Sequence, residues 1–280
     1  MTVVDSTTTL RSRVNERLEE LLPKREGLHF LLFEGAHYSL MLPGKRLRPL
    51  LLLSILQDYN VPIEKGLDVA CALEMIHTYS LIHDDLPCMD DDDLRRGKPS
   101  LHKVYGEGQA VLVGDFLLTY AFEILATCGA SQEITAIIAK AAGGHGMIGG
   151  QLVDILFEGK EIDWNILQFM YLGKTAALFS AALECGAILS RSPLNEREAL
   201  KRCGELYGVA FQMQDDILDV TSDTSTLGKP AKSDIAKGKS NCITLFGKER
   251  ATEIAAEYKK SALEMLPSEC HHTLKVISNI

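Results

Sequence analysis

The amino-acid sequence predicts an all-α protein that folds as an antiparallel helical bundle. Apolar residues recur at spacings of three and four along long stretches of the chain, whereas alternating strand-like runs between turn residues are hard to find. No Pro/Ser-rich linker divides the chain, so we expect residues 1–280 to form a single domain. The central helices of such a bundle are buried on all sides, and functional groups should line its interior cavity.

The predicted helices follow one another along the chain, with turn residues between them. Pro49 fits the first turn of the second helix, where a missing backbone N–H is tolerated. Turns are predicted at Pro43-Gly44, Asn60-Val61-Pro62, Gly97-Lys98-Pro99, Ser192-Pro193 and Gly228-Lys229-Pro230. The predicted helices are Thr9–Leu22, Arg48–Asp58, Glu64–Asp85, Gly108–Cys128, Gln132–Phe157, Trp164–Leu189, Asn195–Val220 and Lys248–Leu266.

Composition excludes several classes of protein. With 46% hydrophobic and 24% charged residues, the chain has the composition of a globular protein and not of a disordered or collagen-like one. The 29 basic and 38 acidic residues give a net charge of -9, which argues against a general nucleic-acid or anionic-membrane binder. No run reaches the roughly 18 uncharged apolar residues of a membrane span, and Met1 to Arg13 lacks the apolar core of a signal peptide.

The cysteines indicate a reducing compartment. They number 7, are scattered along the chain, and form no Cys-x-x-Cys pair. We expect all of them to be free thiols that fill the core as small apolar residues, in a soluble cytoplasmic protein.

An acidic cluster follows the third predicted helix. Asp84 and Asp85 should lie on its last turn, and Pro87 should end the helix, because proline disfavours helical geometry at the residue before it. On a straight helix Asp84 and Asp90 would lie about 240° apart, so a loop must carry Asp90 back toward the pair. A solvated surface loop is the alternative. The buried-looking helix before the cluster and the basic Arg95-Arg96-Gly97-Lys98 after it favour an anion site.

A second acidic cluster ends the helix predicted at Asn195–Val220. Asp215 and Asp219 are four residues apart and so share a helical face, with Asp216 alongside. Carboxylates so close repel one another and need cations when they are buried. Oxygen ligands without Cys or paired His favour Mg²⁺, or Mn²⁺ as a substitute. Three divalent ions would balance the six principal aspartates, and the cavity could then accept a polyphosphate.

Basic and polar side chains predict a second, metal-free anion site. Lys45 and Arg48 precede or begin a helix, and His77 lies seven residues before Asp84, on nearly the same face. Together with Arg96 they could bind a second diphosphate, although a surface patch and a core histidine are the alternatives. Further candidates are Lys174, Thr175, Lys229 and Lys239.

Short motifs occur in one order along most of the chain. They are Gly44-Lys-Arg-Leu-Arg-Pro49, Glu74-Met-Ile-His77, the first aspartate cluster with a two-residue insertion, Arg95-Arg-Gly97, Gly114-Asp115, Gly149-Gly-Gln151, Gly173-Lys-Thr175, Phe211-Gln-x-x-Asp-Asp-Ile-Leu-Asp219 and Gly228-Lys229. In this set the chain closely resembles the trans-isoprenyl diphosphate synthases, particularly bacterial farnesyl and short-chain geranylgeranyl diphosphate synthases. The resemblance implies the isoprenoid synthase type of helical bundle and a magnesium-dependent homodimer. It also implies head-to-tail condensation of isopentenyl diphosphate with an allylic diphosphate such as dimethylallyl or geranyl diphosphate.

The resemblance also implies a role for each candidate residue. The metals would be held by Asp84, Asp85, Asp90, Asp215, Asp216 and Asp219. The allylic diphosphate would contact Arg95, Lys174, Thr175, Gln212, Lys229 and Lys239, and isopentenyl diphosphate would contact Lys45, Arg48, His77 and Arg96. Ionisation of the allylic diphosphate would leave a carbocation near Lys174, Thr175 and Gln212, and the departing pyrophosphate would take the final proton.

Product length should depend on residues beneath the first aspartate cluster. Tyr79 and Ser80 precede Asp84 by five and four positions, about 7.5 and 6 Å along the helix. In the family a large residue at the first of these positions forms the floor of the space for the growing product. Tyr79 therefore favours a C15 product, although a C20 product remains open. The alternative is that Tyr79 is an ordinary core tyrosine. The chain departs from its relatives at Ser233 and Asn241-Cys-Ile243, and its C-terminus is slightly short.

Two other functions compete with a synthase. One is a non-catalytic subunit of a heteromeric prenyl synthase, although such subunits usually lack one or both aspartate clusters. The other is a class I terpene cyclase, whose second cluster would normally be an Asn/Asp-Ser/Thr-Glu motif and which would not need Lys45, Arg48 and Arg96.

Overall fold

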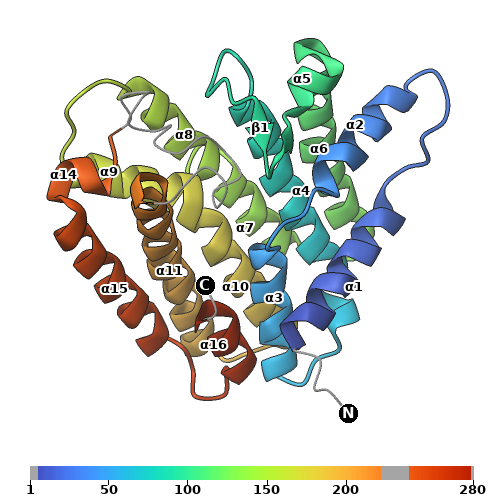
Figure 1. Ribbon diagram of the computed structural model, residues 1–280. Coiled ribbons are helices and arrows are strands. Elements are labelled where there is room, and N and C mark those ends of the chain that lie inside the picture. Colours follow the sequence, from blue (N-terminus) through green and yellow to red (C-terminus); the bar gives the residue numbers. More distant parts are fainter. Residues whose placement is uncertain (1–5, 222–239, 279–280) are drawn as a thin grey trace.

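The predicted all-α bundle is confirmed by the structure, a computed structural model that describes residues 6–221 and 240–278 (Figure 1). Its first half contains α1 (Ser6–Leu21), α2 (Phe30–Leu40), α3 (Leu47–Asp58), the 3₁₀ turn η1 (Ile63–Lys65), α4 (Leu67–Asp84), β1 (Leu94–Arg95), β2 (Lys98–Pro99), α5 (Leu101–Tyr105) and α6 (Glu107–Thr127). Its second half contains α7 (Gln132–Ala142), α8 (Met147–Leu156), α9 (Trp164–Met170), the π-helical η2 (Tyr171–Ala176), α10 (Ala177–Ser190), α11 (Leu194–Thr221), α14 (Cys242–Phe246), α15 (Lys248–Glu264) and α16 (His271–Ser278).

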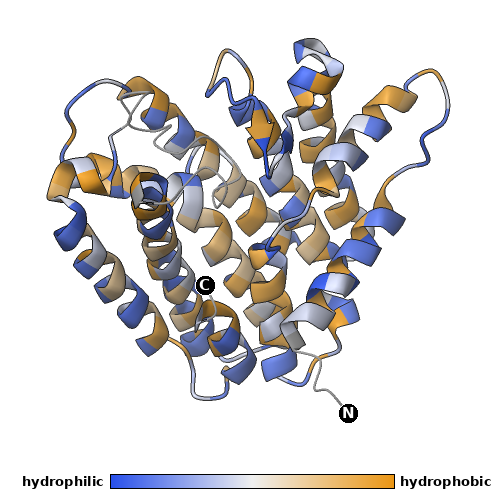
Figure 2. Cartoon of the chain, in the orientation of Figure 1, coloured by the Kyte–Doolittle hydropathy of each residue, from blue (hydrophilic) through white to orange (hydrophobic). Residues whose placement is uncertain are grey.

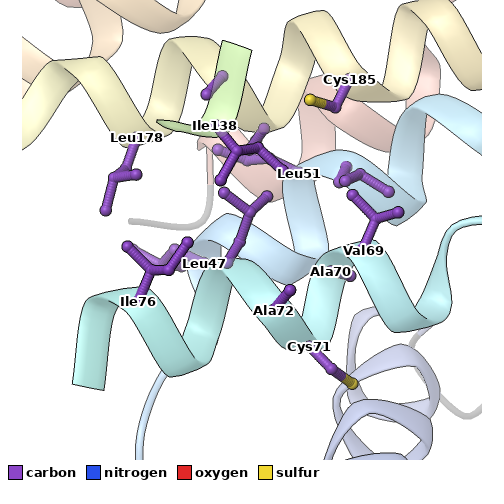
Figure 3. Packing of buried hydrophobic residues seen from close by; sticks show 14 of the residues in the cluster. Leu47, Leu51, Val69, Ala70, Cys71, Ala72, Ile76, Ile138, Leu178 and Cys185 are labelled. Atoms are coloured by element: carbon purple, nitrogen blue, oxygen red, sulfur yellow. The ribbon is translucent and has the colours of Figure 1, made fainter. Parts of the chain in front are cut away.

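The core lies where α3, α4, α7 and α10 meet. Leu51, Ile76, Ile138 and Leu178 come from these four helices and turn toward one another (Figure 3). All four are fully buried. The central α10 is mostly apolar, whereas α15 on the outside carries much more polar surface (Figure 2), as expected for inner and outer helices of a bundle.

Glycines explain why one predicted helix forms two separate helices in the structure. The helix expected over Gln132–Phe157 is interrupted between α7 and α8 by Gly143, Gly144 and Gly146. Gly146 has φ -142° and ψ -124°, and a Cβ there would lie 2.0 Å from the carbonyl oxygen of Ala141. Only glycine fits this turn. The break redirects α8 so that it packs on η2.

Several short elements escaped the sequence prediction. Helices α2, α5, α14 and α16 were not expected, and a small antiparallel hairpin pairs Leu94 with Pro99. Its two-residue turn is Arg96-Gly97, and both residues have positive φ, 53° and 76°. Two positive φ angles are the requirement of a type I′ turn, whose twist matches the flanking strands. The hairpin therefore fixes the backbone positions from which the Arg95 and Arg96 side chains extend.

The fold brings both acidic clusters to the same end of the bundle. In Figure 1 helices α4 and α11 both end in the upper half of the molecule, α4 near the hairpin and α11 near α14. Asp84 is the last residue of α4, as predicted from Pro87, and Asp215, Asp216 and Asp219 lie in the last two turns of α11.

Two helical stretches in the described part of the chain are long and apolar enough to cross a membrane. They are Glu107–Thr127 and Trp164–Ser190. The sequence analysis expected none, because charged residues interrupt the apolar runs. In the second stretch 67% of the apolar window is buried in the bundle, as in the core helices of many proteins. Only 39% of the window is buried in the first, which is α6.

The cysteines are all free, as predicted, but not all are buried. Cys71, Cys185, Cys203, Cys242 and Cys270 are buried in the structure. The prediction of burial is wrong for Cys88, which is exposed, and only partly right for Cys128, which is half-buried. Cys88 is exposed because it follows Pro87 in the loop that leaves α4.

Candidate functional site

A cavity of about 770 Å³ runs between the ends of α4 and α11, with a smaller one of about 210 Å³ beside it. Asp84 and Asp216 line both, Asp90 lines the smaller one, and Asp215 lines the larger one. The structure therefore brings residues of the two predicted acidic clusters together across one interior space. Both cavities are also lined by Leu81, Arg95, Lys174, Thr175 and Gln212.

The loop after α4 folds back as its sequence predicts. The backbone N–H of Asp90 donates to the carbonyl oxygen of Asp84 at 2.8 Å, and the N–H of Asp91 donates to that of Leu86 at 3.1 Å. Asp91 has φ 50°, a left-handed conformation in which aspartate is one of the better-tolerated residues. These bonds place Asp90 beside the end of the helix.

The six aspartates of this run have three different surroundings. Asp84 and Asp90 line the cavity. Asp85 is buried and accepts hydrogen bonds from Arg95. Burial raises the pKa of the Asp85 carboxyl, and the Arg95 guanidinium opposes this shift.

The remaining members of the run divide between interior and surface. Asp92 is buried, lies 3.4 Å from Arg95 and lines the smaller cavity. Asp91 and Asp93 are exposed and face Lys103, at 3.9 and 2.7 Å. Sequence alone did not separate these groups, because the loop conformation decides which carboxylates turn inward.

In the second cluster Asp216 is the centre of a buried hydrogen-bond network. It accepts from the Tyr171 hydroxyl and, at 3.0 Å, from Gln212 Nε2. The backbone N–H of Cys242 lies 3.3 Å from the same carboxylate. This network joins η2, α11 and the start of α14. Asp215 is exposed and lines the larger cavity, whereas Asp219 is buried and lines neither.

Lys174 reaches the acidic end of the cavity from η2. Its Nζ lies 2.7 Å from Asp154 Oδ2. Burial by itself lowers the pKa of the Lys174 ammonium, but the carboxylates of Asp84, Asp154 and Asp90 together hold it above its usual range. Lys174 is therefore a fixed positive charge beside the aspartates. Asp154 was missed by the sequence analysis, although it lies one helical turn after Gln151.

Close backbone packing fixes the position of η2 against α8. A Cβ on Gly150 would lie 2.2 Å from the backbone nitrogen of Lys174, and one on Gly173 would lie 2.8 Å from the carbonyl oxygen of Gly146. The π-helical turn begins at Tyr171, and such turns often mark functional sites. Glycine at both positions lets the two backbones touch, which holds Lys174 and Thr175 in place.

Gln212 is oriented from two sides. The Thr175 hydroxyl donates to Gln212 Oε1 at 2.6 Å, and Gln212 Nε2 donates to Asp216 at 3.0 Å. The amide is thus fixed with its oxygen toward Thr175, and both residues line the cavity.

The other end of the cavity is basic. Lys45, Arg48, His77 and Arg96 all line it, as predicted. Burial lowers the pKa of Arg48 to about 10, so its guanidinium is still charged at neutral pH. Burial and the nearby charges of Arg48 and Arg96 lower the pKa of His77 well below its usual range, so its imidazole is neutral there.

A buried ion pair that the sequence analysis missed supports this basic end. Arg46 Nη1 and Glu74 Oε1 are 2.7 Å apart, and both side chains are at most 2% exposed. Arg96 Nη2 lies 3.9 Å from the same oxygen. Arg46 also donates to the carbonyl oxygens of Leu40 and Leu42, at 2.6 and 3.1 Å. Glu74 therefore holds the guanidinium groups of Arg46 and Arg96 together. The signal in the sequence was Glu74 itself, a charged residue inside an apolar helix.

Apolar side chains form the third part of the cavity lining. Tyr79 and Ser80 come from α4, opposite a stripe of exposed residues on α8 made of Ile148, Leu152 and Ile155. Tyr79 is only 5% exposed, and burial raises the pKa of its hydroxyl to about 12. The α8 stripe was not predicted as part of the site.

The donors of the cavity suit Mg²⁺ held together with a ligand. Among the described residues no group of three or more His, Cys, Asp or Glu side chains forms a ready-made metal site. Mg²⁺ is typically held by one or two carboxylates and by substrate phosphates, not by an all-protein cage. Asp84, Asp90, Asp215 and Asp216 provide oxygen ligands of this kind along the two neighbouring cavities.

Part of the predicted site lies outside the described residues. Lys229, Lys239 and the departure at Ser233 fall in residues 222–239. The departure at Asn241 is described. Asn241 caps α14 by accepting hydrogen bonds from the backbone N–H groups of Ile243 and Thr244, both at 3.0 Å.

Comparisons with known proteins agree with this geometry. The family model for polyprenyl synthetase matches residues 30–280. The chain is 42% identical to the heterodimeric geranylgeranyl pyrophosphate synthase large subunit 1 of Arabidopsis thaliana, with 90% of this chain and 71% of the relative covered. It is 43% identical to the farnesyl diphosphate synthase of Bacillus subtilis, with 82% and 80% covered. A geranyltransferase from Helicobacter pylori, solved with magnesium and isoprenyl diphosphate, is 34% identical with a TM-score of 0.88, and 98% of this chain and 95% of that one are covered.

Proposed function

Because the chain belongs to the polyprenyl synthetase family, we propose that its two-ended cavity binds an allylic diphosphate at the acidic end and isopentenyl diphosphate at the basic end. The protein is a prenyltransferase that joins these substrates head to tail and makes C15 or C20 products. The observation that carries the assignment is that Asp84, Asp215 and Asp216 line the same cavity as Lys45 and Arg48.

At the acidic end the chain stabilises the leaving group. Lys174 and Arg95 place fixed positive charges beside Asp84, where the diphosphate of the allylic substrate would lie. Positive groups aimed at charge that develops in the transition state lower the barrier to ionisation. Bound Mg²⁺, about three ions in our proposal with Mn²⁺ as a substitute, would add Lewis-acid stabilisation of the departing pyrophosphate. Asp84, Asp90 and Asp215 are the residues best placed to hold it.

Oxygen atoms next to this end stabilise the positive carbon that ionisation leaves. The Gln212 amide oxygen and the Thr175 hydroxyl oxygen are held 2.6 Å apart at the cavity wall. The amide C=O and the hydroxyl group are dipoles that are oriented before the reaction, so little reorganisation is needed when the charge develops. The double bond of isopentenyl diphosphate then attacks the allylic carbon, and a proton leaves to the pyrophosphate.

At the basic end Lys45, Arg48 and Arg96 bind the second diphosphate without metal. His77 is neutral and can donate a hydrogen bond to a phosphate oxygen. A terpene cyclase has no use for a second diphosphate site. Both acidic clusters and this basic end are present in the described part of the chain, so neither a cyclase nor a non-catalytic subunit is favoured.

Turnover with labelled substrates tests this function. The purified protein is incubated with isopentenyl diphosphate and dimethylallyl, geranyl or farnesyl diphosphate, and the products are sized. We expect elongation with at least one primer in Mg²⁺, and its loss after chelation with EDTA followed by recovery when Mg²⁺ is restored. Absence of elongation with every primer would refute the assignment.

Product length is expected to depend on Tyr79. Tyr79→Ala should lengthen the main product by one or more isoprene units, because it removes a ring from the apolar wall opposite α8. Tyr79→Phe is the matched control. Among the described residues the Tyr79 hydroxyl has no hydrogen-bond partner, so its loss should leave the product length unchanged. If Tyr79→Ala gave the wild-type product distribution, Tyr79 would not be the floor.

We also propose that the protein is a homodimer in the cytoplasm. Helix α6 supports the dimer, since it carries the exposed side chains of Val111 and Leu112, at 39% and 60%. The seven free thiols support a reducing compartment. Sedimentation equilibrium should give twice the chain mass of 30.8 kDa. A single-chain mass without detergent would reject the dimer, and solubility only in detergent would indicate a lipid contact.

A further inference from the structure

Tyr79 has a neighbour on the same face of α4. His83 follows it by four residues, which places the two about 40° apart around the helix. Their rings meet edge to face, with centroids 5.7 Å apart and planes at 84°. Both rings line the large cavity. The tyrosine beneath the acidic end therefore packs against a second ring, that of His83.

His83 is fixed from the other side by α6. Its Nε2 lies 3.0 Å from the carbonyl oxygen of Val111, which can only accept, so this nitrogen carries a proton. Asp115 Oδ1 lies 3.9 Å from the same nitrogen. Gly114, between them in sequence, leaves the space that the imidazole occupies. A Cβ on Gly114 would lie 2.1 Å from His83 Nε2 and 2.4 Å from Cδ2.

Tyr79 has no comparable polar anchor. In the described part of the chain its buried hydroxyl makes no hydrogen bond. The ring is therefore held by packing alone, and an edge-to-face aromatic contact is the directional part of that packing. Anything that moves His83 should let the Tyr79 ring move.

We propose that His83 is a positioning residue for product length, because its ring holds the ring of Tyr79. Glycine at position 114 has no side chain and so leaves the space that the His83 imidazole occupies. In this proposal α6 fixes the position of the His83 ring, and the His83 ring fixes the position of the Tyr79 ring that limits product length. The inference rests on the proposed function, in which Tyr79 limits chain growth. It adds two residues that neither bind a diphosphate nor hold a metal.

The experiment compares product distributions of Gly114→Ala and Gly108→Ala. Both add one methyl group to α6, but at Gly108 nothing lies within 4 Å of the added Cβ. We expect Gly114→Ala to raise the share of products longer than the main wild-type product about two- to twelvefold, the range that corresponds to loss of one aromatic pair. Gly108→Ala should give the wild-type distribution. Equal distributions for the two variants would overturn the role of Gly114.

A second set of variants separates positioning from direct contact and avoids any clash. His83→Ala removes atoms only, so it decides the question if Gly114→Ala does not fold. It should lengthen the product, and the Tyr79→Ala/His83→Ala double variant should match Tyr79→Ala alone. A double variant with still longer products would make His83 part of the floor itself and overturn the positioning role. Wild-type protein that elongates no primer would instead count against the proposed function.

Discussion

Replacing Asp84 with asparagine is expected to lower kcat about a thousandfold, with the fold unchanged. The substitution keeps the shape of the side chain and removes its charge. Asp84 lines both cavities, and its backbone carbonyl receives the bond that folds the Asp90 loop back. Only the carboxylate is lost in the variant, so the loop should stay in place. The measurement is steady-state kcat over a range of Mg²⁺ concentrations.

Asp93→Asn is the control for this variant. It makes the same chemical change in the same acidic run, but Asp93 is exposed and pairs with Lys103 at 2.7 Å. We expect its kcat to stay within about twofold of wild type, because this exposed ion pair is screened by solvent and lies outside the cavity. Equal losses in the two variants would show that the run acts through its total charge and that the position of Asp84 has no special role.

Glu74→Gln is expected to destabilise the protein by about 3 kcal/mol. Breaking a buried ion pair leaves an uncompensated charge, which typically costs about 3–5 kcal/mol, and glutamine recovers part of that by hydrogen bonding. Here the charge left behind is Arg46, and Arg96 and Arg48 also lose the attraction of the Glu74 carboxylate. The free energy of unfolding in urea measures the loss. The KM for isopentenyl diphosphate should rise as well, because Arg96 loses the carboxylate that positions it.

A surface pair provides the comparison. Arg202 and Glu205 are also 2.7 Å apart, but their side chains are 55% and 31% exposed. Glu205→Gln should cost less than about 1 kcal/mol. If Glu74→Gln cost no more than this, the buried pair would not hold the basic end together.

The sequence predicted the long elements and the helix ends that carry the chemistry. The end of α4 followed from Pro87, and the return of Asp90 followed from the angle that a straight helix would impose. The break before α8 was missed, because periodicity continues through the glycines and only backbone contacts reveal it. Helix α2 was missed for a different reason, since its apolar residues lack a clear helical period.

For the site, the sequence predicted which residues gather at the cavity but not the partners and burial of each side chain. The pattern correctly gathered Lys45, Arg48, His77 and Arg96 around one space. It did not distinguish Asp84, which lines the cavity, from Asp85, which accepts from Arg95. It also missed Asp154, and it gave no role to Glu74 although Glu74 begins one of the motifs, because an acidic residue in a helix shows its buried partner only when the chain is folded. The metal roles of all six residues stay predictions: Asp84, Asp85, Asp90, Asp215, Asp216 and Asp219.

The contact between Gly150 and the backbone of Lys174 has a consequence for redesign of this protein. The α8 stripe lines the large cavity, and its helix is in direct backbone contact with the segment that carries Lys174. Substitutions at Leu152 or Ile155 can enlarge the product space by shortening side chains. Substitutions that displace the α8 backbone would shift the Lys174 charge as well, so selectivity and rate would change together. Variation confined to side-chain size is therefore the route by which new specificities can arise without loss of turnover.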